Sequence, residues 1–151
     1  MMKPDESAKP TLNGLRKIKR IDTFEVVTFF RSSGPRLLAL KSPQGAPRYL
    51  TTEMCTVGPR LEIGLLTIWD LGDPSPEGTA ESFQGGNVMS MEFLASPGFS
   101  LISGVRFRLE NEHLVFTPGA MPLSICVKYG EIQRGQPEYP FDEYTVVCLP
   151  T

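Results

Sequence analysis

Few side chains in this sequence could carry a reactive centre. His113 is the only histidine, and the three cysteines, Cys55, Cys126 and Cys148, are separated by tens of residues. A cupredoxin copper site needs two histidines and a cysteine, and a cupin metal site also needs more than one histidine, so neither fits. Structural zinc sites bring their ligands in close pairs, which this spacing lacks. The sequence therefore predicts no metal site and no cofactor.

Two catalytic alternatives stay open. Cys126 and His113 both fall in the outward phase of predicted strands and could form a nucleophilic dyad, although no nucleophile signature surrounds the cysteine. Surface carboxylates could serve a hydrolase, because spacing in the chain does not reveal the separation of two acids in space. The candidate acids are Glu62, Asp70, Asp73, Glu92, Glu110, Glu112, Asp142 and Glu143. No pattern in the sequence indicates that two of these acids lie close together, so we name no catalytic residue.

Alternation of apolar and polar residues is the strongest structural signal. In residues 105–109 the side chains of Val105, Phe107 and Leu109 share one face, and two arginines share the other. The same period of two continues to residue 148, where it predicts a final strand over 143–149 with Tyr144, Val146 and Cys148 facing inward. The pattern is typical of a β-sheet with one buried face.

Glycine and proline mark the connections between the strands. The chain holds 14 of each, spread between short apolar runs, which favours many antiparallel strands. Residues 55–59 are expected to be a connector, and 71–87 a long loop that contains one short helix over 77–83. After that loop, 88–94 is predicted as a strand with Met89, Met91 and Phe93 inward.

These segments predict an antiparallel β-sandwich, immunoglobulin-like or jelly-roll in style, with a small β-barrel as the alternative. Residues 1–12 are expected to be a flexible arm and 13–151 a single domain. The arm lacks the apolar stretch of a secretory signal, and no run is long and apolar enough to span a membrane. Together with three unpaired cysteines, this predicts a cytoplasmic protein.

The charges are unevenly distributed along the chain. Residues 1–60 carry 11 Lys and Arg against 5 Asp and Glu, whereas residues 61–151 carry 4 against 12. A basic cluster at 16–20 could contact nucleic acid, but the acidic balance of the rest of the chain argues against nucleic acid as a partner. If the asymmetry forms surface patches, it favours self-association or a charged protein partner.

Two segments are the candidate binding surfaces. The first is the predicted loop over 73–87, and the second is the proline-bearing segment 136–141, whose aromatic side chains the loop cannot bury by itself. The candidate site residues are Asp73, Glu77, Asn87, Tyr139 and Phe141. The sequence therefore predicts a non-catalytic binding module that engages a protein partner or self-associates. A module for a small molecule or carbohydrate, which exposed aromatics among acids and amides would serve, is the alternative.

Overall fold

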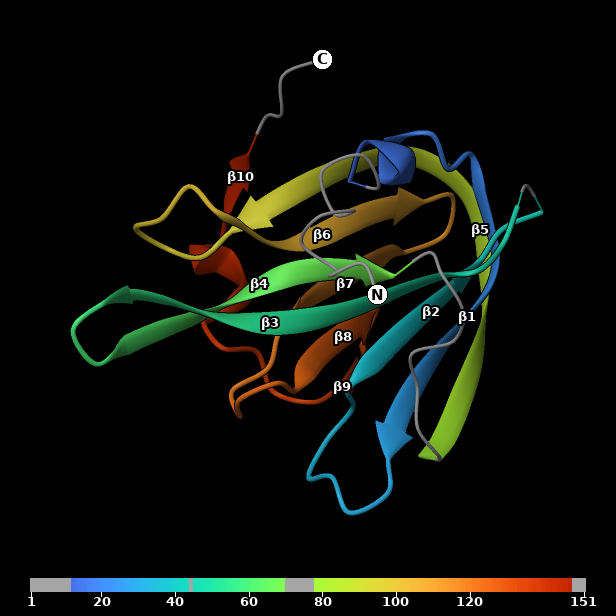
Figure 1. Ribbon diagram of the computed structural model, residues 1–151. Coiled ribbons are helices and arrows are strands. Elements are labelled where there is room, and N and C mark those ends of the chain that lie inside the picture. The colour runs from blue at the N-terminus through green and yellow to red at the C-terminus, as the bar shows by residue number, and fades with distance from the viewer. Residues whose placement is uncertain (1–11, 44, 70–77, 148–151) are drawn as a thin grey trace.

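Ten β-strands account for most of the residues that the computed structural model describes, 12–43, 45–69 and 78–147 (Figure 1). The strands are β1 (Arg20–Phe29), β2 (Leu37–Lys41), β3 (Arg48–Gly58), β4 (Leu61–Trp69), β5 (Gly78–Ala95), β6 (Ile102–Leu109), β7 (His113–Pro118), β8 (Ile125–Tyr129), β9 (Ile132–Arg134) and β10 (Thr145–Val147). A short 3-10 helix, η1 (Phe141–Glu143), precedes β10, and residues 12–16 form a helical turn. Within these described ranges, no helix has the length and hydropathy needed to span a membrane.

The strands form one large antiparallel sheet. Its order is β4-β3-β2-β1-β5-β6-β7-β8-β9, and β10 pairs with β5 beside this path. The end strands, β4 and β9, are not hydrogen-bonded to each other, so the sheet is not closed. The prediction of a single all-β antiparallel domain is confirmed, and the alternative of a small barrel is wrong because the sheet ends remain open.

Strand β5 joins the two halves of the sheet. Its first half, to Asn87, pairs with β1, and its second half pairs with β6. At Gly85 the backbone of β1 comes so close that a Cβ atom would lie 2.0 Å from the Ile21 carbonyl oxygen. The predicted loop over 71–87 and its helix over 77–83 are therefore wrong from residue 78 onward, where β5 begins. Gly85 permits a close approach between two strands and does not end one. Residues 71–77 of the predicted loop lie outside the described residues.

A β-bulge shifts the register of β5 between Val88 and Ser90. An extra residue in one strand reverses the side on which the following side chains lie. Met89 is consequently 64% exposed, contrary to its predicted inward orientation, whereas Phe93 is buried and Met91 packs against the core as predicted.

The hydrophobic core takes residues from both halves of the sheet. Strands β1 to β4 contribute Phe24, Leu38, Leu50 and Ile68, and strands β5 to β8 contribute Phe93, Val105, Phe107, Leu109, Leu114, Phe116 and Val127. The ring of Phe24 stacks on Phe83 at 5.2 Å and meets Tyr129 edge-on at 5.0 Å. The inward face predicted for Val105, Phe107 and Leu109 is therefore confirmed.

Two boundary predictions are wrong. The predicted connector over 55–59 lies within β3 as far as Gly58, and the β3–β4 hairpin extends away from the body of the protein (Figure 1). The last strand begins at Thr145, two residues later than predicted, and its described part ends at Val147. Val146 is exposed, contrary to its predicted inward orientation, while Tyr144 is buried beside Cys126. Cys148 and, apart from Leu12, the predicted arm lie outside the described residues.

Candidate functional site

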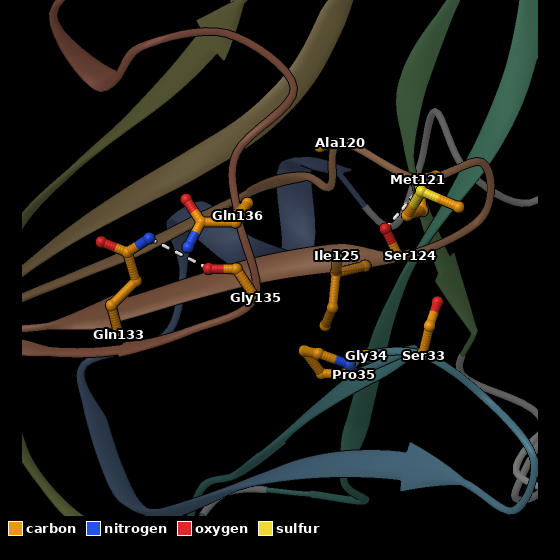
Figure 2. A pocket seen from close by; sticks show the side chains of 10 residues that line it. All are labelled: Ser33, Gly34, Pro35, Ala120, Met121, Ser124, Ile125, Gln133, Gly135 and Gln136. Carbon is orange, nitrogen blue, oxygen red and sulfur yellow. Dashed lines mark hydrogen bonds between the residues drawn. The ribbon is translucent and has the colours of Figure 1, made fainter.

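A concavity of about 640 Å³, called here the loop hollow, lies where the β1–β2 loop meets the β7–β8 loop (Figure 2). Its lining residues are Ser33, Gly34, Pro35, Ala120, Met121, Ser124, Ile125, Gln133, Gly135 and Gln136. In Figure 2, Gln133 and Gln136 lie at one end of the hollow and Met121 and Ser124 lie at the other. None of the lining residues carries a charge.

Hydrogen bonds hold the two loops against each other. Arg36 donates from Nε to the Ser32 hydroxyl at 2.9 Å and from Nη1 to the Pro122 carbonyl at 2.9 Å. The backbone N–H of Ile125 donates to the Pro35 carbonyl at 2.9 Å. The walls of the hollow are thus fixed by contacts between residues far apart in the chain, which favours a preformed surface.

The polar groups inside the hollow divide into two kinds. The Ser124 hydroxyl donates to the Met121 carbonyl at 2.6 Å, and the Gln133 amide donates to the Gly135 carbonyl at 3.0 Å. These groups stabilise the loops themselves. The side chains of Ser33 and Gln136 form no hydrogen bond with the described part of the chain. They are therefore available to a ligand as a hydroxyl and as an amide that both donates and accepts.

A second concavity of about 410 Å³, the hairpin hollow, lies between the same β7–β8 loop and the β3–β4 hairpin. It is lined by Met54, Thr56, Arg60, Leu61, Glu62, Gly119, Ala120, Pro122 and Glu138. The backbone N–H of Gly64 donates to Glu138 Oε1 at 3.3 Å. Burial raises the pKa of the Glu138 carboxyl, and the bond from Gly64 partly offsets that rise. Ala120 lines both hollows, so the β7–β8 loop separates two adjoining depressions.

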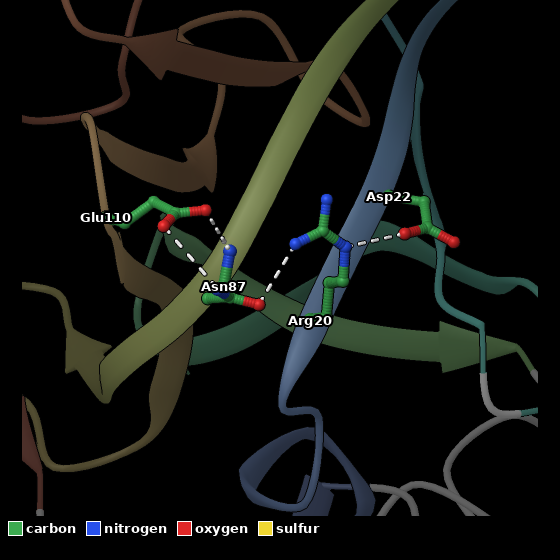
Figure 3. A network of polar contacts seen from close by, with 4 residues as sticks. All are labelled: Arg20, Asp22, Asn87 and Glu110. Atoms are coloured by element: carbon green, nitrogen blue, oxygen red, sulfur yellow. Dashed lines mark hydrogen bonds and ion pairs between the residues drawn. The ribbon is translucent and has the colours of Figure 1, made fainter.

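Asn87 lies in a network of polar side chains at the bend of β5 (Figure 3). Its amide oxygen accepts a bond from Arg20 Nη1 at 3.0 Å, and its backbone N–H donates to Glu110 Oε1 at 3.1 Å. Arg20 also pairs with Asp22 at 2.9 Å. These contacts hold β5 to β1 and to the end of β6, away from the loop hollow. Asp73 and Glu77, the other two candidates from that segment, lie outside the described residues.

The two aromatic candidates pack on the outer side of the sheet. Tyr139 meets Tyr144 edge-on at 6.1 Å, and the Lys128 ammonium lies 5.2 Å from the centre of the Phe141 ring. Phe141 also lines a third hollow, of about 450 Å³, together with His113 and Arg106. Neither ring lines the loop hollow, although Gln136, at the start of the same predicted segment, does.

The structure does not bring Cys126 and His113 together. Cys126 is paired in register with Thr117, which is four residues from His113 and hence roughly 13 Å along the strand. Cys126 is fully buried, and burial raises the pKa of its thiol to about 12. Among the described residues, no three His, Cys, Asp or Glu side chains are grouped so that they could hold a metal ion.

The raised pKa predicts that Cys126 is unreactive in the folded protein. The thiolate is the nucleophile, and a thiol with a pKa of about 12 stays protonated at pH 8. Iodoacetamide at pH 8 should therefore label the half-buried Cys55 before Cys126, which should react only after denaturant is added. Peptide mapping by mass spectrometry distinguishes the cysteines. Equal labelling rates of Cys55 and Cys126 in the native protein would contradict this environment.

Sequence reasoning missed the β1–β2 and β7–β8 loops as functional elements. Ser33, Gly34 and Pro35 in the first loop and Pro122 in the second are common turn residues, so the sequence by itself indicates only turns between strands. One available signal is Leu123, a large apolar residue that directly follows a proline in the second loop.

No protein-family model matches the chain, and neither a curated protein nor a solved structure matches it. The function must therefore be inferred from the chemistry and the positions of the residues. The loop hollow is the candidate site with the clearest vacant hydrogen-bonding groups.

Proposed function

We propose that the protein is a non-catalytic binding module that engages an extended segment of a protein partner in the loop hollow. One observation carries the proposal: an uncharged hollow between loops fixed by hydrogen bonds holds a hydroxyl and an amide that no described residue uses. Polar groups that lack a hydrogen-bond partner and are held on rigid walls are typical of recognition sites. Such a site must orient its ligand but does not react with it.

A polypeptide backbone matches these groups. Every peptide unit other than proline offers one donor and one acceptor, and the Gln136 amide offers both kinds of group in return. Met121, Ala120 and Pro35 provide apolar surface next to them. The carbohydrate alternative depended on exposed aromatic rings, and the rings of Tyr139 and Phe141 pack outside this hollow. A protein segment is therefore the ligand that the site favours.

Gln136→Ala tests this proposal. Peptides would be selected on the native protein from a displayed library of random short sequences, and their affinities measured by fluorescence anisotropy. Removing the amide should weaken binding about tenfold, because the loss of one hydrogen bond to the ligand costs about 1.4 kcal/mol. Gln84→Ala, which changes an exposed glutamine of β5 outside the hollow, is the matched control and should leave affinity unchanged. Equal affinities of all three proteins would contradict the proposal.

Self-association is a second candidate, favoured by the free edges of β4 and β9. At the free edge of β4, the described chain supplies one hydrogen-bond partner from outside the sheet. This partner is the Glu138 carboxylate, which accepts from the Gly64 N–H. Sedimentation over a range of concentrations should detect a dimer if this edge pairs between copies. A strict monomer at every concentration would exclude it.

We also propose that the two halves of the sheet pack face to face as a β-sandwich. The shared core supports this arrangement, as does Gly64 of β4, where a Cβ atom would lie 2.5 Å from the Cβ of Pro118 in β7. At another edge, Arg134 of β9 forms two bonds of 2.7 Å to the Glu81 carboxylate of β5. Nuclear Overhauser contacts between the rings of Phe24 and Tyr129 are expected, and their absence would contradict face-to-face packing.

A further inference from the structure

Three turns in the described chain share an unusual backbone conformation. Arg31, Arg60 and Leu123 have positive φ angles of 66°, 60° and 64°, and they are the only described non-glycine residues that do. Each is the third residue of a four-residue turn with a negative φ at the second position, which is the pattern of a type II turn. The turns are Phe29–Ser32, Gly58–Leu61 and Met121–Ser124.

The third position of a type II turn is normally glycine or asparagine. Glycine adopts a positive φ without steric cost, whereas a side chain with a Cβ atom is strained there. Arg31, Arg60 and Leu123 are all exposed, so burial in the core does not compensate for this strain. Strained residues of this kind cluster at functional sites, which indicates that these side chains serve an interaction with another molecule.

The three turns lie at one end of the protein. The loop hollow joins the β1–β2 loop to the β7–β8 loop, and the hairpin hollow joins the β7–β8 loop to the β3–β4 turn. Arg36 links the first turn to the third, because it donates both to the Ser32 hydroxyl and to the Pro122 carbonyl. We call the exposed arginine and large apolar side chains of these turns the turn face; they are Phe30, Arg31, Arg60, Leu61, Met121 and Leu123.

The turn face combines apolar area with positive charge. Phe30 is 61% exposed, Met121 57%, Leu123 52% and Leu61 42%, so that four of the eight large apolar side chains found exposed in the described chain lie here. Clusters of exposed apolar side chains mark interaction sites. Arginine, methionine and aromatic residues are also the types enriched where proteins bind one another.

The two arginines of the turn face have no acidic partner. Arg20, Arg106 and Arg134 each form an ion pair, whereas Arg31 and Arg60 make no hydrogen bond or ion pair with the described residues. Of the two carboxylates that line the hairpin hollow beside Arg60, Glu138 is bonded to the Gly64 N–H, and Glu62 is exposed. The guanidinium groups are therefore available to carboxylates of another molecule.

We propose that the turn face recognises a protein segment in which carboxylate side chains alternate with large apolar ones. This inference rests on the proposed function and specifies the partner's chemistry beyond the backbone contacts in the loop hollow. A second copy of the chain does not fit, because two identical faces would place arginines against arginines. Arg31 and Arg60 select the acidic residues, and Phe30, Met121 and Leu123 contact the apolar ones.

The test uses the peptides selected on the native protein from the random library. The selected sequences should be enriched in Asp and Glu next to Leu, Ile or Phe. The double variant Arg31→Gly/Arg60→Gly should bind them at least about tenfold more weakly, because both charged contacts are lost. Its melting temperature should equal or exceed that of the native protein, since glycine accepts the positive φ at both positions. Arg108→Gln removes an exposed charge from β6 and should leave affinity unchanged.

Other results would separate this inference from the proposed function. Peptides without an acidic preference, bound equally by the double glycine variant but more weakly by Gln136→Ala, would overturn the turn-face proposal and leave the binding module intact. A library that yields no binding peptide would overturn both. A clear fall in the melting temperature of the double variant would show that the arginines serve the fold.

Discussion

Phe24→Ala is expected to lower the free energy of unfolding by about 4 kcal/mol, measured by urea titration. Phe24 is fully buried in β1, and its ring contacts Phe83 of β5 and Tyr129 of β8. Removing the ring leaves a cavity in the core that both halves of the sheet share, and it also removes two aromatic contacts. If the variant still folds, a loss below about 1 kcal/mol would contradict the shared core.

Phe30→Ala is the matched control for this experiment. Phe30 lies in the turn directly after β1, on the turn face, and is largely exposed. Its replacement should change stability by less than about 0.5 kcal/mol, as is usual for surface positions. The same variant should nevertheless bind the selected peptides more weakly. Two phenylalanines close together in the chain are thus expected to separate stability from binding.

Gly85→Ala is expected to cost about 3 kcal/mol of stability. The added Cβ atom would meet the Ile21 carbonyl oxygen at 2.0 Å, so β1 and β5 must separate locally. Because backbone atoms form the obstacle, side-chain movement cannot relieve it. Thermal unfolding followed by circular dichroism would measure the effect.

Gly58→Ala controls for the loss of a glycine as such, because a Cβ atom there meets nothing within 4 Å. It should melt close to the native protein. Equal melting temperatures for Gly85→Ala and Gly58→Ala would contradict the close contact of the two strands.

The sequence predicted the strands wherever one face is buried and the other is solvated. Val105, Phe107 and Leu109 alternate with two arginines, and this pattern has only one arrangement in a sheet. The first half of β5 escaped prediction because its residues are mostly exposed and polar from Gly78 to Gln84. Such a strand gains its stability from pairing with β1, a contact between distant residues that local sequence does not encode.

The candidate site was less predictable than the strands. Arg36 and Pro122 are 86 residues apart, and only the folded sheet brings their loops together. Tyr139 and Phe141 were reasonable anchors for a ligand because they are aromatic residues in a polar loop. In the structure they pack against Tyr144 and Lys128 on the outer side of the sheet. The two arginine turns left a local signal, a large residue where a turn favours glycine, but their convergence depends on tertiary structure.

The most direct test of the binding module is amide chemical-shift mapping of the isotope-labelled protein titrated with a selected peptide. The account predicts that the shifts are confined to the lining of the loop hollow and to the turn face, from Phe30 to Arg36, from Arg60 to Glu62, and from Ala120 to Ile125 together with Gln133 and Gln136. Shifts centred on Phe141 and His113, with none at the loop hollow, would contradict it.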